Sequence, residues 1–229
     1  MSTSTTLPPG NCFVKLNQEV TVIDYGVGNL LSVQRGFEYV GAKVIVTSDP
    51  KIILASERVV LPGVGAFPNA MRALNDLSLT PVIQKFAELG GPVLAICLGM
   101  QLLMDESDEF GITSGLCLIP GRVVQLPPET KAGEPQKIPH IGWGELQVSD
   151  TRKDWSGTLL QDIQLGDATY FVHSYIAQPA SPAHSIAEVK YGGHQIPAVI
   201  SKNQITGCQF HPEKSGEVGL KILRRFVQQ

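Results

Sequence analysis

The chain has 229 residues, of which 43% are hydrophobic and 17% are charged, and its formal net charge is -3. This size fits one well-buried domain or two small ones, and the weakly acidic balance argues against a nucleic-acid-binding surface. The longest mostly apolar stretch, residues 93–104, is too short to span a bilayer, so no membrane association is expected.

The N-terminal segment has no pattern that could form a packed face. We expect residues 1–18 to be a flexible tail and residues 19–229 to form the folded domain. The segment also lacks the basic start and apolar core of a secretory signal. The four cysteines, Cys12, Cys97, Cys117 and Cys208, are widely spaced and form no C-x-x-C pair. A zinc site or a disulfide framework is therefore not expected, and a reducing cytoplasm fits.

The next part of the chain alternates short apolar runs with helical patterns. Strands are predicted at residues 20–24, 43–47, 58–61 and 92–97, and helices at 29–40, 66–76, 81–89 and 98–104. Gly41 is a plausible C′ residue for the first helix. Strands that are apolar on both faces and separated by helices indicate a parallel sheet that is covered on each side.

From residue 116 onward the pattern becomes rich in strands. Strands are predicted within residues 122–126, 141–148, 168–176, 185–191 and 196–209. No long helix separates them, so antiparallel hairpins are expected, with a tight turn at Lys202-Asn203. The polar stretch 127–135 indicates an exposed loop, and residues 216–227 form a helix that docks on the domain. The fold class is therefore α/β, with a mostly parallel central sheet and an antiparallel extension.

Cys97 follows a buried strand and begins a helix. A nucleophile at such a sharp turn projects from the sheet, and the unpaired N–H groups of the helix N-terminus favour its thiolate form. The alternative, a cysteine that is merely a small buried hydrophobe, is as probable from this position alone.

His211 and Glu213 supply the groups that a cysteine nucleophile needs. Pro212 favours an extended conformation at His211, and in an extended chain the side chains of residues i and i+2 share one face. Glu213 can therefore hold one nitrogen of the imidazole while the other faces a thiol.

Residues 95–101 (AICLGMQ) together with the distant His211-Pro-Glu213 resemble the class I, or triad, glutamine amidotransferases, whose fold is flavodoxin-like. Five further segments resemble one branch of that family, the glutaminase subunits of imidazole glycerol phosphate synthases. They are residues 23–30 (IDYGVGNL), 61–67 (LPGVGAF), 138–143 (IPHIGW), 170–175 (YFVHSY) and 207–216 (GCQFHPEKSG). The resemblance extends over residues 20–229. It departs at Gly144, where the family usually carries Asn.

The resemblance implies glutamine hydrolysis through a thioester on Cys97, with His211 as acid and base and Glu213 as its orienting group. The expected oxyanion hole comprises backbone N–H groups of Gly63, Val64, Gly65 and Leu98. Glutamine is expected to contact Gln101, Glu109 and the backbone of His173, Ser174 and Tyr175. No metal or organic cofactor is implied.

The resemblance also implies a partner. A chain of this length has no room for the enzyme that uses the ammonia, so a heterodimer with a (β/α)₈-barrel cyclase subunit is expected. Residues expected near that interface are Pro139, His140, Trp143, Tyr170 and Lys214. The resemblance further implies an oxyanion hole that is completed only when the partner is bound, and hence low activity of the lone subunit.

Other interpretations remain open from the residues. A related glutaminase could supply ammonia for sugar amidation in surface polysaccharide synthesis. A cysteine peptidase or another triad hydrolase would need the same three residues. A nucleotide-binding module is a weaker alternative, because Leu31 stands where the third glycine of its fingerprint belongs. A catalytically silent scaffold is disfavoured by the complete triad.

Overall fold

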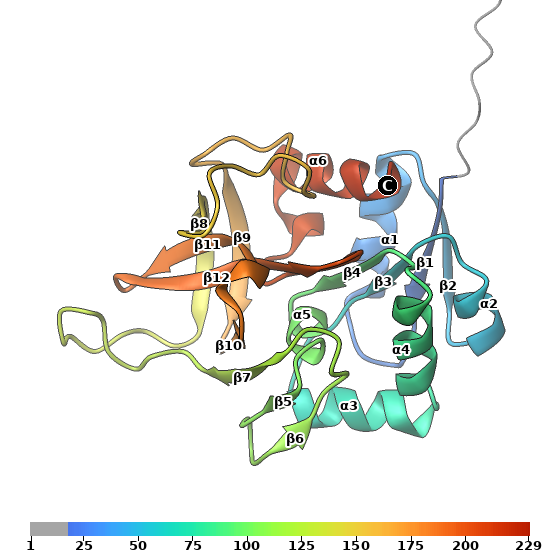
Figure 1. Ribbon diagram of the computed structural model, residues 1–229, viewed down its shortest axis with the longest axis horizontal. Coiled ribbons are helices and arrows are strands. Elements are labelled where there is room, and N and C mark those ends of the chain that lie inside the picture. The colour runs from blue at the N-terminus through green and yellow to red at the C-terminus, as the bar shows by residue number, and fades with distance from the viewer. Residues whose placement is uncertain (1–17) are drawn as a thin grey trace, which may run out of the picture.

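The structure is a computed structural model that describes residues 18–229. The predicted tail, residues 1–18, lies outside the described residues except for Gln18. Nine strands form the main sheet in the order β2-β1-β3-β4-β13-β12-β11-β8-β9, and a smaller sheet has the order β10-β7-β5-β6 (Figure 1).

The first half of the main sheet is parallel, as the alternation of strands and helices predicts. Its strands are β2 (Lys43–Thr47), β1 (Glu19–Ile23), β3 (Val59–Leu61) and β4 (Val93–Ile96). The helices of this half are α1 (Leu30–Tyr39), α2 (Pro50–Leu54), α3 (Phe67–Asp76), α4 (Thr80–Glu88) and α5 (Leu98–Leu102). The short helix α2, which begins with Pro50 at its first position and is capped by Asp49, was not predicted.

Two hydrophobic cores lie on the two faces of this sheet. Alternate residues of each strand enter different cores: Leu94 and Ile96 contribute to one, and Val93 and Ala95 to the other. The first core includes apolar residues of α1 and of α6 (Gly216–Val227), and the second includes residues of α2, α3, α4 and α5. Figure 1 shows α6 above the sheet and α3 below it. Helices on both faces explain why the strands are apolar throughout.

The second half of the main sheet is largely antiparallel. It contains β8 (His140–Val148), β9 (Ala168–His173), β11 (Ser185–Tyr191), β12 (His194–Lys202) and β13 (Ile205–Cys208). The short turn between β12 and β13 includes Asn203, whose φ is 56°. The expectation of hairpins alone is wrong at β13, which pairs antiparallel with β12 but parallel with β4. This strand therefore joins the two halves.

The remaining elements form a small second layer. It contains β5 (Glu106–Ser107), β6 (Thr113–Ser114), β7 (Gly121–Gln125) and β10 (Tyr175–Pro179), with the 3₁₀ turns η1 (Pro182–His184) and η2 (Pro212–Lys214) elsewhere. The single strand predicted over residues 168–176 is divided at Ser174, and its two parts enter different sheets. The polar stretch 127–135 is a largely exposed loop between β7 and β8, as predicted (Figure 1).

Candidate active site

Cys97 lies at a strained turn between β4 and α5. Its φ and ψ are 55° and -111°, a conformation that L-residues rarely adopt. Its N–H donates to the carbonyl of Cys208 at 2.7 Å, which ties the turn to the end of β13. Gly99 makes the turn possible, because a Cβ atom there would lie 2.0 Å from the Leu61 carbonyl oxygen. The side chain is thus presented at the carboxyl ends of the parallel strands.

His211 and Glu213 follow β13 and form a short ion pair. His211 Nδ1 lies 2.8 Å from Glu213 Oε1, and both side chains are buried. His211 has the extended conformation that Pro212 favours, with φ -101° and ψ 97°. The predicted extended path ends there, however, because residues 212–214 form η2. The 3₁₀ turn, and not strand alternation, brings the carboxylate to the ring.

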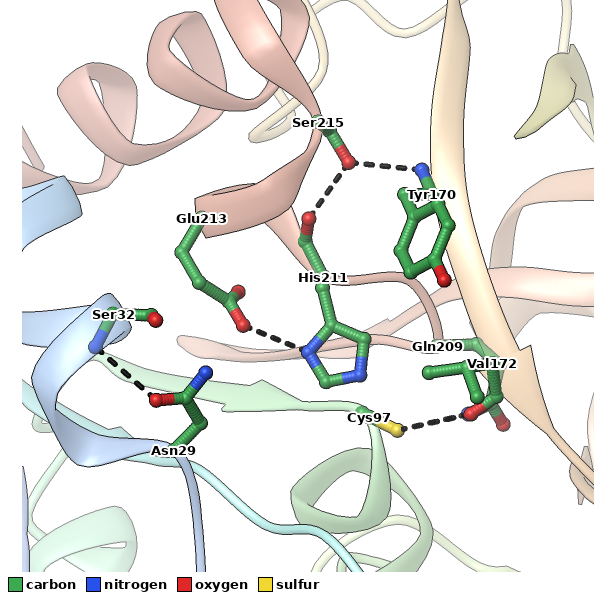
Figure 2. A network of polar contacts seen from close by, with 9 residues as sticks. All are labelled: Asn29, Ser32, Cys97, Tyr170, Val172, Gln209, His211, Glu213 and Ser215. Atoms are coloured by element: carbon green, nitrogen blue, oxygen red, sulfur yellow. Dashed lines mark hydrogen bonds and ion pairs between the residues drawn. The ribbon is translucent and has the colours of Figure 1, made fainter. Parts of the chain in front are cut away.

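The second ring nitrogen of His211 is directed toward Cys97. Figure 2 shows the imidazole between the Glu213 carboxylate and the Cys97 sulfur. His211 Nε2 is buried and has no hydrogen-bond partner among the described residues. Burial lowers the pKa of His211, but its interactions with Cys97 and Glu213 raise it by more, to about 10. Both neighbours therefore favour the protonated imidazole.

Ser215 fixes the backbone of His211, a role that no pattern in the sequence indicates. Its hydroxyl donates to the His211 carbonyl at 2.7 Å and accepts from the Tyr170 N–H at 3.0 Å. The His211 N–H donates in turn to the Tyr170 carbonyl at 2.9 Å. Two hydrogen bonds thus join the turn that carries His211 to the middle of β9, and a third lies within the turn. Figure 2 shows the two that Ser215 makes.

A cavity of about 280 Å³ opens beside Cys97 and His211. The other residues of its lining are Val64, Gly65, Leu98, Gln101, Glu109, Pro139, Val172, His173, Ser174 and Tyr175. Of these, only Val172 was not predicted; its carbonyl lies 3.8 Å from Cys97 Sγ. Glu213 lies behind His211 and does not line the cavity. Apolar walls with a few directed polar groups suit a small polar substrate.

The predicted oxyanion segment lies at the cavity, although not every residue of it reaches the lining. Val64, Gly65 and Leu98 line the cavity, whereas Gly63 does not. Gly63 is packed instead, because a Cβ atom there would lie 2.8 Å from the Tyr25 hydroxyl and 2.9 Å from the Gly99 nitrogen. Gly65 has a φ of 95°, which favours glycine. The segment is therefore held close to the N-terminus of α5.

Gln101 and Glu109, the two polar side chains expected to contact glutamine, are both buried. Gln101 is 5% exposed, and its Nε2 donates to the Tyr175 carbonyl at 2.9 Å. Glu109 is 8% exposed, and its Oε2 accepts from the Phe67 N–H at 2.7 Å, at the N-terminus of α3. That helix end stabilises a carboxylate.

His140 and His173 form a buried pair at the cavity edge. His140 Nδ1 lies 3.1 Å from His173 Nε2, and His173 Nδ1 lies 3.0 Å from the Tyr175 carbonyl. Burial lowers the pKa of His140 to about 4, and burial together with His140 lowers the pKa of His173 to about 3. Both rings are neutral at pH 7. His140 is stacked on Tyr191 and is 4% exposed, so it lies beneath the surface where a partner is expected.

The other residues expected near an interface are accessible. Trp143 is 60% exposed and its ring meets that of Tyr170 edge-on, with centroids 6.0 Å apart. Ile141, two residues before Trp143 on β8 and not predicted, is 54% exposed. Lys214 is exposed, and Pro139 lines the cavity. An apolar and aromatic surface therefore adjoins the cavity.

Gly144 is accommodated by close packing. It pairs with Thr169 across β8 and β9, and a Cβ atom there would lie 2.5 Å from Val189 Cγ2 and 3.1 Å from the Phe171 ring. The departure from the expected Asn is therefore matched by neighbouring side chains that fill the space.

Metal-binding and membrane-spanning features are both absent from residues 18–229. No group of three or more His, Cys, Asp or Glu side chains in this range could hold a metal ion. No helix in the same range is long and apolar enough to cross a membrane.

The chain matches a known family over most of its length. The model described as "Glutamine amidotransferase class-I" matches residues 21–229. The "Imidazole glycerol phosphate synthase subunit HisH 1" of Legionella pneumophila (strain Lens) is 49% identical over 209 residues, which cover 91% of this chain and 98% of that protein. The "Imidazole glycerol phosphate synthase subunit HisH" of Bacillus cereus is 45% identical over 207 residues, covering 90% and 93%.

Solved structures show the same fold at lower sequence identity. One described as "Crystal structure of glutamine amidotransferase" aligns with a TM-score of 0.68 at 14% identity, covering 91% of this chain and 97% of that one. This similarity supports the predicted α/β architecture with its antiparallel extension.

Proposed function

Because the chain belongs to the class-I glutamine amidotransferase family, we propose that it hydrolyses glutamine and supplies the ammonia to an imidazole glycerol phosphate synthase. It is the glutaminase subunit of that synthase and serves histidine biosynthesis. The observation that carries the chemistry is His211, held by Glu213 at one nitrogen and open toward Cys97 at the other.

The first half of the reaction forms a thioester. The Cys97 thiolate attacks the amide carbon of glutamine, and the carbonyl electrons move to the oxygen. Backbone N–H groups of Leu98, Val64 and Gly65, which line the cavity, stabilise this oxyanion. As the intermediate collapses, the C–N bond breaks and His211 transfers its Nε2 proton to the nitrogen, which leaves as ammonia.

The second half releases glutamate. Neutral His211 takes a proton from water, the oxygen attacks the thioester carbon, and the C–S bond breaks. Glutamate leaves and Cys97 returns as the thiolate beside the protonated imidazole. Glu213 keeps its contact with Nδ1 throughout, which stabilises the positive ring and fixes its tautomer.

Specificity for glutamine follows from the polar groups of the cavity. The Glu109 carboxylate suits the α-amino group, and Gln101 with the backbone from His173 to Tyr175 suits the α-carboxylate end. Glu109 retains one oxygen for a ligand, since only Oε2 is bonded to the Phe67 N–H. A free amino acid fits such a small cavity better than an extended peptide does.

The ammonia needs a sheltered route, because in neutral water it is mostly protonated and no longer nucleophilic. The acceptor is a cyclase subunit with a (β/α)₈ barrel, bound over Trp143 and Tyr170 with Lys214 nearby. Trp143 is exposed and Tyr170 is half-buried, and accessible aromatic residues of this kind are common interface hot spots. The three free cysteines of the described residues fit a cytoplasmic location.

The test is glutamate release from glutamine by the chain alone and in complex with the cyclase and its nucleotide substrate. Cys97→Ala and His211→Asn are expected to abolish release. Cys117→Ala is the matched control, because Cys117 is exposed and lies outside the cavity. The unmodified chain is expected to release glutamate slowly when it is alone and faster in the complex with the cyclase.

Each outcome bears on a different step. Full activity of Cys97→Ala would refute the thioester mechanism. Vigorous hydrolysis without the cyclase would refute an oxyanion hole that depends on the partner. If glutamate release depends on Cys97 but is not changed by the cyclase, the glutaminase function stands. The partner would then be sought among sugar-amidating enzymes.

A further inference from the structure

Gln209 is a fully buried amide in direct contact with the nucleophile, and the proposed mechanism does not use it. It follows β13, two residues before His211, and has 0% exposure. Its Nε2 lies 3.9 Å from Cys97 Sγ, within hydrogen-bonding range for sulfur, and its Oε1 accepts from Gln101 Nε2 at 3.1 Å. One side chain thus contacts both the nucleophile and a residue expected to bind substrate.

The orientation of this amide is fixed by neighbouring groups. The Tyr175 carbonyl can only accept hydrogen bonds, so the end of Gln101 that contacts it must be the NH₂ group. That same NH₂ group contacts Gln209, which must therefore present its oxygen to Gln101. The NH₂ group of Gln209 is left facing the Cys97 sulfur.

The same carbonyl also orients the histidine pair. It accepts from His173 Nδ1, so His173 Nε2 carries no proton and accepts from His140 Nδ1. A continuous chain of hydrogen bonds therefore runs from His140 on β8 to Cys97. The Tyr175 carbonyl oxygen sets the direction of every hydrogen bond in this chain, because it can accept hydrogen bonds but cannot donate them.

We propose that Gln209 is a positioning residue that holds the Cys97 sulfur in the cavity and stabilises its thiolate form through the Nε2–H donor. A donor favours the charged form of an acceptor over the neutral form, because the hydrogen bond to the anion is stronger. The effect of Gln209 on catalysis rests on the proposed glutaminase function, whereas its effect on the Cys97 thiol does not.

The direct test compares Gln209→Met with unmodified protein in the alkylation of Cys97 by iodoacetamide. Methionine matches the length of glutamine but has no N–H donor. The rate at Cys97 is followed against pH by mass spectrometry of the peptide that carries it. Loss of one hydrogen bond to a charged sulfur is expected to raise the pH of half-maximal rate by about 1, and to slow alkylation at pH 7 about tenfold.

Gln101→Met is the comparison variant, because it keeps the Gln209 donor but removes the group that orients it. Its pH of half-maximal alkylation is expected to rise by less than that of Gln209→Met, while KM for glutamine rises in the complex with the cyclase. Gln209→Met is expected to lower kcat as well as raise KM. If Gln209→Met leaves the alkylation profile of Cys97 unchanged, the proposal is wrong.

A measurement on unmodified protein covers the case in which Gln209→Met fails to fold. In ¹⁵N-labelled chain, the side-chain amide of Gln209 is expected to shift with pH at the same midpoint as alkylation of Cys97, and to stop shifting in Cys97→Ala. An amide that does not respond to pH would overturn the proposal. Absence of glutamate release by the unmodified complex would instead refute the proposed function, while the alkylation and amide results would still decide the role of Gln209.

Discussion

Gly99→Ala tests whether close packing of α5 on β3 sets the position of the nucleophile. The added Cβ atom would lie 2.0 Å from the Leu61 carbonyl oxygen, whereas real Cβ contacts essentially never fall below 3.0 Å. Both groups belong to the backbone, so neither can rotate away. The helix must therefore move from the central sheet by about 1 Å, and Cys97 at its N-terminus must move with it.

The expected cost follows from that displacement. Overpacking of this kind costs about 2 kcal/mol, which lowers Tm by about 6 °C in a chain of this size. A displacement of about 1 Å at the reacting sulfur is expected to lower kcat/KM for glutamine about 100-fold. The loss of activity should therefore exceed what the loss of stability alone would cause.

The assay combines thermal unfolding followed by circular dichroism with glutamate release by the complex with the cyclase. Gly133→Ala is the control. Gly133 has a φ of 83° but no atom within 4 Å of the added Cβ, and it lies in the exposed loop before β8. It should lose about 1 kcal/mol of stability and keep its activity. If Gly99→Ala has the same Tm as this control and the kcat/KM of unmodified protein, packing of α5 against β3 does not position Cys97.

Three further changes address neighbouring parts of the structure. The pKa of His140 is lowered to about 4, so the unfolded chain binds a proton between pH 6.5 and 4 that the folded chain excludes, and stability falls as pH falls. From pH 7.5 to 5.5 the free energy of unfolding should therefore drop by about 1 kcal/mol more in unmodified protein than in His140→Phe, measured with urea; equal drops would contradict this. Ser215→Ala should cost about 2 kcal/mol in the same assay and lower kcat, because it leaves the Tyr170 N–H without its partner and the His211 carbonyl with the Lys214 N–H alone. Unchanged stability would show that water replaces the hydroxyl. Trp143→Ala should weaken binding of the cyclase at least tenfold by calorimetry without lowering the Tm of the lone chain, and unchanged affinity would place the interface elsewhere.

Local patterns are sufficient where one segment determines its own structure. The buried strand before Cys97 and the helix after it are visible in residues 92–104, and the extended conformation of His211 follows from Pro212. The bounds predicted for β2, β11 and α6 agree with the structure because their patterns end at clear turns. Residue types and local spacing therefore indicate the candidates for the proposed triad, and the resemblance to the amidotransferase family makes the assignment specific.

Local sequence patterns do not predict the structure of a segment whose conformation or burial depends on residues far away in the sequence. Residues 168–176 form an uninterrupted strand pattern, yet the chain enters two different sheets on either side of Ser174. The short β13 follows a hairpin turn, but its parallel pairing with β4 depends on a strand more than 100 residues earlier. No local signal distinguishes a buried His140 from an exposed one, since the rings that cover it come from β9 and β11.

The sequence by itself determined which chemistry this chain carries: a cysteine at an elbow and a His-x-Glu pair are readable from residue types and short spacings. Only the tertiary structure decided how that chemistry is arranged. The contacts of Gln209 with Cys97 and of Ser215 with Tyr170 join segments separated by 112 and 45 positions. Hydrogen bonds act over about 3 Å in space whatever the distance along the chain, so such partners become known only when folding has brought them together.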